Sequence, residues 1–208
     1  MIPLSFLNPM QMLSLNSSTP LPLVSQRILT LACLCPGEDE PLFNVVVAKA
    51  CKYPICHIEL VFEDDMSFSI FADTNLFFKP RTFSNPDYHL VSLLVSSMEY
   101  NSAYTFCLNA HKYDVKFSNL AMFASYCQPR NCPLFCTTPS VHAGSTFCSK
   151  IITEALQFAG VFEVEHLTPC TTTPSHLFKA VKDSSRRVLN SVPYKREMLK
   201  QIGSLALT

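Results

Sequence analysis

A cysteine stands near the predicted start of a helix, where a thiolate is favoured. Phe147 opens an amphipathic pattern whose apolar residues recur at helical spacing as far as Gly160, and Cys148 falls in its first turn. The positive end of a helix and its free N–H groups stabilise a thiolate. The same N–H groups can hold an oxyanion during acyl transfer, with those of Phe147 and Ser149 as candidates. Cys148 is therefore the candidate nucleophile.

A thiol nucleophile needs a base, and His57 is the best-placed histidine. It begins an alternating segment whose other face is apolar, so its side chain points away from that packing. A third polar group would orient the imidazole. Ser69 and Asp73 on the partner strand are the nearest candidates, and Glu59 on the strand of His57 is a weaker one.

Two other interpretations compete with this pair. Most cysteines are structural, and a histidine such as His111, on an apolar helical stripe, is usually a packing residue. The remaining histidines have no stronger claim than His57. A cluster of three cysteines and a histidine resembles a metal site, but it lacks the closely paired cysteines typical of zinc. We therefore predict no metal site and no cofactor. The residues of that cluster are Cys127, Cys132, Cys136 and His142.

Composition excludes several classes of protein. Sixteen basic residues balance sixteen acidic ones, whereas a general nucleic-acid binder carries a basic surplus, so we predict no nucleic-acid partner. The four glycines are scattered, which excludes glycine-rich phosphate loops. No apolar run reaches the roughly 18 residues of a membrane-spanning helix, and we predict no transmembrane segment. The start of the chain lacks the pattern of a secretory leader. Ten cysteines then suggest an intracellular, reducing compartment, with most thiols buried as small hydrophobic groups.

Hydrophobic periodicity predicts one domain of strands and helices over residues 25–183, between an irregular N-terminal arm at 1–24 and a polar, basic surface tail at 184–208. A helix after Pro41 competes with a strand through 45–47. A β-hairpin is predicted at 57–72, with its turn at 63–65, and residues 127–146 are loop-like. The other predicted elements are strands at 28–35 and 89–95 and helices at 104–111, 147–160 and from 173–174 onward.

Two segments together resemble a known group of proteins. They are YPICHIELVFEDDMSFSIFA at 53–72 and STFCSKIITEALQFAG at 145–160, and TTTPSHLFKAV at 171–181 is similar to a later step of the same group. The group is the permuted NlpC-like papain-fold superfamily, which includes lecithin retinol acyltransferase-like, bacterial and poxvirus-type viral members. Its histidine precedes its cysteine, as His57 precedes Cys148. The resemblance covers roughly residues 28–182.

The resemblance implies an α+β fold, permuted papain-like, with a small antiparallel sheet packed against the helix that carries the cysteine. It also implies that Cys148 is the nucleophile and His57 the base. Members place a third polar residue on the strand after the histidine, but residues 67–72 contain no His, Asn or Gln. Many members also begin with a Gly-Asp pair, where this chain has Gly37-Glu38-Asp39.

These patterns predict a cysteine-dependent hydrolase that works through an acyl-enzyme. Its substrate would be a peptide, an amide or an acyl ester, and transfer to another acceptor would make it an acyltransferase. The alternative is a non-catalytic interaction protein that keeps the fold. If the protein is viral, as the resemblance suggests, its compartment would be the host cytoplasm or nucleus.

Overall fold

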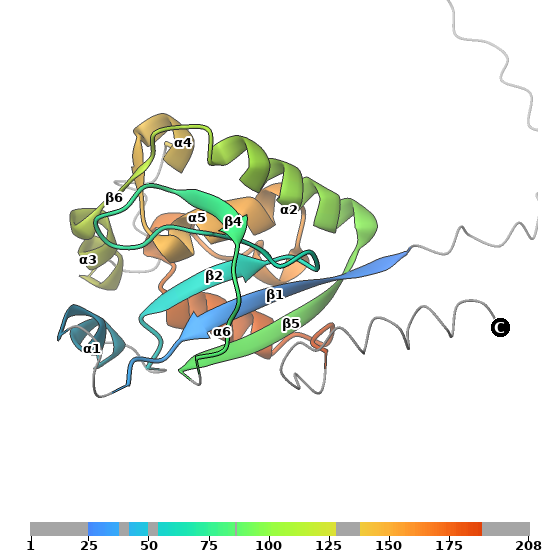
Figure 1. The fold of residues 1–208 in the computed structure, drawn as a ribbon, viewed down its shortest axis with the longest axis horizontal. Coiled ribbons are helices and arrows are strands. Elements are labelled where there is room, and N and C mark those ends of the chain that lie inside the picture. The colour runs from blue at the N-terminus through green and yellow to red at the C-terminus, as the bar shows by residue number, and fades with distance from the viewer. Residues whose placement is uncertain (1–24, 38–41, 50–53, 86, 128–137, 189–208) are drawn as a thin grey trace, which may run out of the picture.

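A computed structural model of the chain describes residues 25–37, 42–49, 54–85, 87–127 and 138–188. These residues form an α+β fold with a five-stranded antiparallel sheet in the order β4-β3-β2-β1-β5 (Figure 1). The predicted arm at 1–24 and most of the predicted tail lie outside the described residues. The strands of the sheet are β1 (Gln26–Leu34), β2 (His57–Val61), β3 (Met66–Ser69), β4 (Phe77–Pro80) and β5 (Tyr88–Ser96).

The predicted strands at 28–35, 57–62, 67–72 and 89–95 are confirmed as β1, β2, β3 and β5. The long strand β1 lies between β2 and β5, so that Leu34 is opposite both His57 and Tyr88. The hairpin of β2 and β3 brings Val61 opposite Ser67. Strand β4 was not predicted, because the consecutive Phe77 and Phe78 hide the alternation of a half-buried strand.

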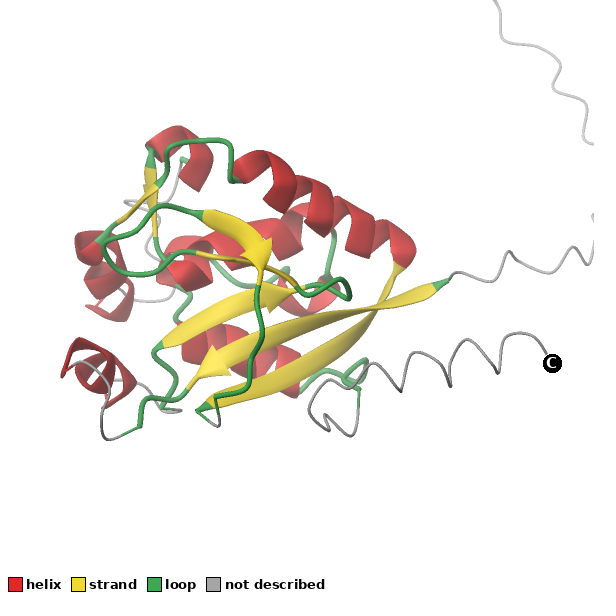
Figure 2. Cartoon of the chain, viewed as in Figure 1, coloured by secondary structure: helices red, strands yellow, loops and turns green. Residues whose placement is uncertain are grey.

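The two faces of the sheet differ in chemistry. One face carries buried apolar side chains such as Leu31, Ile58 and Phe68, which belong to the main core. Helices α2 (Ser97–Ala110), α5 (Cys148–Phe158) and α6 (Pro174–Lys182) pack further side chains into that core. Figure 2 shows α5 and α6 behind the strands in this view. The opposite face carries the polar residues His57 and Glu59, so these two titratable groups lie on the side of the sheet away from the core.

The predicted helices are confirmed, with changes at their ends. The one predicted at 104–111 begins earlier, at Ser97, because Ser96 and Glu99 form a capping box. A helix also forms after Pro41, as α1 (Leu42–Lys49), and the strand alternative is wrong. The remaining elements were not predicted, and two of them interrupt the predicted loop at 127–146. They are α3 (Asn119–Cys127), α4 (Ser140–Ala143), a parallel pair of β6 (Lys116–Phe117) and β7 (Ser145–Thr146), and the 3-10 turns η1 (Phe162–Val164) and η2 (Pro169–Thr171).

The start of the predicted tail is part of the fold. The N–H of Leu94 donates to the carbonyl of Arg186, and the N–H of Val188 donates to the carbonyl of Ser92. Residues 186–188 therefore run beside the outer edge of β5, so the first residues of the predicted surface tail pair with the sheet. An edge strand exposes unpaired backbone groups, and this segment covers part of them.

Most described cysteines behave as predicted. Cys33, Cys56, Cys107 and Cys148 are free and buried, and Cys35 is free and half-buried. Cys170 differs, because it is disulfide-bonded. Within the described ranges, no helix is long and apolar enough to cross a membrane.

Candidate active site

Cys148 is the first residue of α5, and the preceding elements fix that position. Gly144 takes a left-handed conformation (φ 66°) that ends α4, and β7 then pairs in parallel with β6. Phe147 caps α5 with extended backbone and no side-chain hydrogen bond. The Cys148 side chain is buried, and it lines the same pocket as the His57 imidazole, whose pKa it raises. The structure thus brings together two residues that are 91 positions apart.

His57 is enclosed on several sides. Its ring stacks on the ring of Phe71, with centroids 4.2 Å apart and planes inclined by 22°. Its Nε2 is 3.7 Å from Oε1 of Glu59. Burial alone would lower the pKa of His57, but the hydrogen bond with Cys148 and the charge of Glu59 raise it to about 9. The imidazole is therefore held as a cation at neutral pH.

Glu59 is a fully buried carboxylate with several partners. It accepts hydrogen bonds from the hydroxyls of Ser67 (2.7 Å) and Tyr88 (3.1 Å). Nε of Arg81 is 3.1 Å from its Oε2. Burial would raise the pKa of Glu59, but His57, Ser67 and Arg81 outweigh that effect and lower it. Burial and the charge of Glu59 raise the pKa of Tyr88, which keeps this phenol as a neutral donor.

The residue that faces the imidazole of His57 is neither of the two that were the nearest candidates for orienting it. The Ser69 hydroxyl donates to the carbonyl of Ile58 at 2.7 Å, so it is engaged with the backbone of β2. Asp73 lies in an exposed turn with φ 60°, whereas the carboxylate that pairs with His57 among the described residues is that of Glu59. Glu59, the weaker candidate, occupies the position instead. Alternation along β2 puts residues 57 and 59 on one face, which was the available signal.

The first turn of α5 supplies the candidate oxyanion donors. Because the helix begins at Cys148, its first free N–H groups are those of Cys148, Ser149 and Lys150. Ser149, one of the two predicted donors, also anchors this turn through a 2.6 Å hydrogen bond from its hydroxyl to the carbonyl of Thr172. Phe147, the other, precedes the turn as its cap and is buried.

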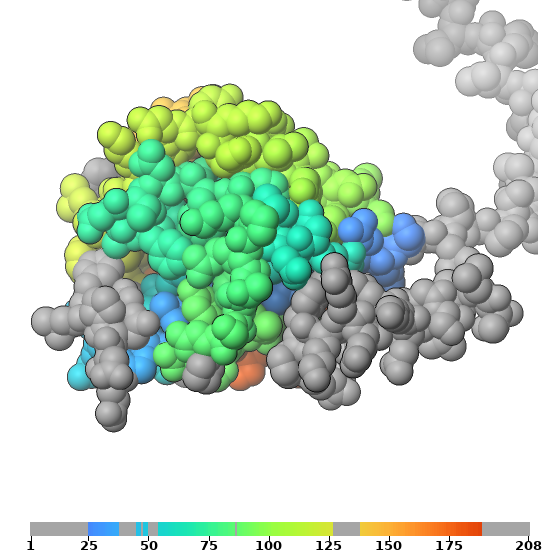
Figure 3. Space-filling view, viewed as in Figure 1, coloured from blue at the N-terminus to red at the C-terminus, as the bar shows by residue number. Residues whose placement is uncertain are grey.

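Cys148 and His57 open onto a common pocket of about 360 Å³. The chain from β4 to β5 crosses this side of the molecule, where Figure 3 shows it over the sheet. One side of the pocket comes from the strand ends and the β4–β5 segment, and the other from α3 and the residues before it. Its lining residues are Leu34, Cys56, His57, Phe71, Ala72, Arg81, Asn85, Tyr88, Phe117, Met122 and Cys148. A substrate that reaches the thiol must enter here.

The competing residues lie elsewhere. His111 ends α2 and is half-buried, with its ring 6.0 Å from that of Phe78, so it packs against the core as predicted. His89 and His142 are exposed. No group of metal-ligating side chains occurs in the part of the chain that the structure describes. Cys132 and Cys136 of the zinc alternative lie outside that part.

Arg81 and Tyr88 are site residues that the sequence analysis missed. Both reach Glu59 from the segment around β4 and β5, whose pairing with the rest of the sheet has no local pattern in the sequence. A larger hollow of about 920 Å³ lies between η1, η2 and α6, but Cys148 and His57 do not line it.

Comparison of the chain with protein-family models, with curated proteins and with solved structures found no match. The function of the site therefore has to follow from its own chemistry.

Proposed function

We propose that the protein is a cysteine-dependent acyl hydrolase with Cys148 as nucleophile and His57 as base. The observation that carries this proposal is that the Cys148 thiol, at the positive end of α5, lines one pocket with the His57 imidazole, whose pKa is raised to about 9. A helix N-terminus and an adjacent imidazolium both favour a thiolate. The pocket beside the pair has space for an acyl group.

In the first step the Cys148 thiolate attacks the carbonyl carbon of an amide or ester. A new C–S bond forms, and the oxyanion accepts hydrogen bonds from the first turn of α5, where Ser149 is a donor. The imidazolium of His57 then gives its proton to the leaving amine or alcohol as the C–N or C–O bond breaks. The product of this step is an acyl-enzyme.

In the second step water resolves the thioester. Neutral His57 takes a proton from water, the hydroxide adds to the acyl carbon, and the C–S bond breaks to release the carboxylic acid. The imidazolium and thiolate are thereby restored. An alcohol or amine in place of water would make the same step an acyl transfer. Glu59 acts through His57, as a positioning residue that keeps the imidazole charged.

The proposed fold is the permuted NlpC-like papain fold. Its support is the order of His57 before Cys148, together with the packing of α5 on the antiparallel sheet that carries the histidine. In this assignment the buried Glu59 takes the place of the polar residue that relatives carry on the following strand.

Exposed apolar residues on α3 favour a second candidate, a non-catalytic interaction protein. Leu120 and Phe123 are 82% and 45% exposed, and Met122 of the same helix lines the pocket. Large exposed apolar side chains beside a pocket are typical of contact surfaces. Under this alternative the thiol would have no turnover.

The two candidates differ in the reactivity of Cys148. The protein is treated with a thiol-reactive acyl probe, and labelled peptides are identified by mass spectrometry. A hydrolase is expected to label at Cys148 before the other free, buried thiols, and to hydrolyse p-nitrophenyl esters or peptide amides. His57→Ala should lower turnover by about 100-fold or more, and Cys148→Ala should abolish it.

His89→Ala is the matched control, because His89 is an exposed histidine on the same sheet. It should leave labelling and turnover unchanged. Uniform labelling of the thiols, or turnover that survives Cys148→Ala, would contradict the hydrolase and leave the interaction protein as the better candidate.

A further inference from the structure

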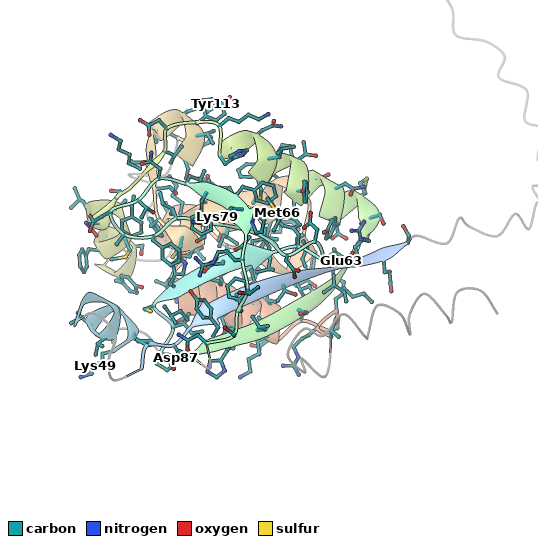
Figure 4. The ribbon with its side chains drawn as sticks, viewed as in Figure 1. Lys49, Glu63, Met66, Lys79, Asp87 and Tyr113 are labelled. Atoms are coloured by element: carbon teal, nitrogen blue, oxygen red, sulfur yellow. The ribbon has the colours of Figure 1, made fainter. Side chains whose placement is uncertain are left out.

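The charged side chains on the pocket wall are both basic. Arg81 and His57 line it, whereas Glu59 has no exposed surface and lies behind them. Asp73 and Asp87 belong to the same part of the chain but do not line the pocket. Figure 4 shows Asp87 at the lower edge of the view, near the start of β5. Among the described residues, a ligand in the pocket therefore meets positive charge and no exposed carboxylate.

The guanidinium of Arg81 is held in place, but only part of it has a partner among the described residues. Nε faces Glu59, and the guanidinium carbon is 5.2–5.8 Å from the ring centroids of Phe71, Phe77 and Phe83. These rings restrain the guanidinium through cation–π contacts. The two terminal amino groups make no hydrogen bond to any described residue, and the side chain is 26% exposed. A guanidinium with free N–H groups forms a fork that fits a carboxylate.

The size of the pocket limits what it can bind. Its volume of about 360 Å³ is near the lower end for ligand pockets, which run from about 300 to 1,000 Å³. The wall also includes Phe71, Phe117 and Met122, which suit a short carbon chain. A small acyl group with one negative charge matches both the volume and the charge.

We propose that the pocket selects acyl substrates that carry a carboxylate close to the scissile bond, and that Arg81 binds this carboxylate. The proposal rests on the proposed function and narrows its substrate class. Arg81 is in this view a specificity residue, while Cys148 and His57 perform the reaction. Pairs of ligands that differ mainly in a carboxylate charge can test this role of Arg81.

Alkylation of Cys148 by iodoacetate and iodoacetamide is the first test, because the two reagents differ mainly in one negative charge. The rate ratio of iodoacetate to iodoacetamide at Cys148 is measured by mass spectrometry and divided by the ratio for glutathione. Wild type is expected to favour iodoacetate. Arg81→Gln should lower the ratio by about tenfold, which corresponds to roughly 1.4 kcal/mol, and Arg81→Lys should keep most of it.

Lys79→Gln is the matched control. Lys79 is an exposed cation two residues earlier on the same face, 5.1 Å from the ring centroid of Phe77, and does not line the pocket (Figure 4). The variant Lys79→Gln removes one positive charge, as Arg81→Gln does, and should leave the iodoacetate-to-iodoacetamide ratio unchanged. A ratio in Arg81→Gln within twofold of wild type would overturn the proposal, as would an equal loss in Lys79→Gln.

Arg81→Gln also removes a cation that pairs with Glu59. A double-mutant cycle separates this effect from the loss of direct anion binding by Arg81. If Arg81 binds the anion directly, Arg81→Gln should lower the ratio by a similar factor when Glu59→Gln is already present. If the loss disappears in that background, Arg81 acts only by neutralising Glu59, and the proposed carboxylate site is wrong.

Hydrolysis of mono-p-nitrophenyl glutarate and of its methyl ester is the second test. Wild type should show a higher kcat/KM for the carboxylate, and Arg81→Gln should remove the preference while still hydrolysing the methyl ester. Turnover of both esters without a preference would overturn the carboxylate site and leave the hydrolase intact. An alkylation ratio that depends on Arg81 without any turnover would overturn the hydrolase and leave the carboxylate site. A Cys148 inert to every reagent would overturn both.

Discussion

Glu59 is the residue on which the protonation state of the candidate site depends. It has no exposed surface, and it bridges the imidazole of His57 and the guanidinium of Arg81. A buried carboxylate is costly unless it is paired, and here hydroxyl donors and cations compensate its burial. Its negative charge in turn stabilises the imidazolium.

We expect Glu59→Gln to lower the pH at which activity is lost on the alkaline side. The thiolate–imidazolium form requires His57 to be protonated, so wild-type kcat/KM should fall as pH rises through about 9. Without the charge of Glu59, the pKa of His57 moves back toward 6.5, and the alkaline limb should move down by about one pH unit. The measurement is kcat/KM for a p-nitrophenyl ester from pH 5 to 10.

Glu165→Gln controls for the loss of a carboxylate, because Glu165 is exposed and does not line the pocket. Its profile should match wild type. An alkaline limb that stays near 9 in Glu59→Gln would show that Glu59 does not set the charge of the imidazole.

The proximity of Cys148 and His57 could be predicted from the sequence, but the network around them could not. Cys148 and His57 each stand at the start of a strongly patterned element, so type and position pointed to them. Ser69 and Asp73 were favoured because they follow on the partner strand, yet one bonds the backbone and the other lies in a turn. Long-range side-chain contacts such as Arg81 with Glu59 leave no periodic signal.

Among the elements, those with a complete local signal were predicted and the others were not. The hairpin of β2 and β3 alternates cleanly, and α6 begins with a Thr173 cap and Pro174. By contrast, β4 is four residues long, and β6 and β7 have two residues each. Tertiary pairing decides elements of this length, so a single sequence does not specify them.

Arg186 joins three elements through charge. Its guanidinium contacts Glu163 in η1 and Glu99 at the start of α2, while Ser184 donates a 2.6 Å hydrogen bond to Glu163. The hydrogen bond from Arg186 lowers the pKa of Glu163 to about 2. This carboxylate therefore favours the folded state fully above pH 4.5 and loses that effect as pH falls toward 2.

We expect Glu163→Gln to remove this acid-sensitive stabilisation. At pH 7 the free energy of unfolding of the variant should be about 2 kcal/mol lower than that of wild type. Solvent screens part of the ion pair, which limits the size of this loss. The difference should shrink between pH 4.5 and 2, where wild type becomes protonated. Urea unfolding at several pH values, followed by circular dichroism, measures it. Glu165→Gln should show no such trend, and a pH-independent difference for Glu163→Gln would exclude the linkage.

At the scale of the whole molecule, the candidate site lies where distant segments meet. The sheet places His57 next to the end of β1. Cys148 lies at the start of α5, and Arg81 lies in the segment between β4 and β5. The core behind the sheet holds these segments in register through side chains of α2, α5 and α6. The geometry of the site therefore depends on the integrity of the sheet, including the edge that residues 186–188 cover.

Two truncations separate the contribution of that segment from that of the residues beyond it. A chain that ends at Val188 keeps the pairing with β5 and the contacts of Arg186, whereas a chain that ends at Asp183 loses both. We expect the shorter chain to melt about 5–10 °C lower, because it loses about 2–3 kcal/mol in a domain of this size. Its uncovered β5 edge should also promote self-association. Thermal unfolding and light scattering measure the two effects, with the chain ending at Val188 as the control. Equal melting temperatures for the two truncations would mean that residues 184–188 add nothing to the sheet, and that β5 is stable as an open edge.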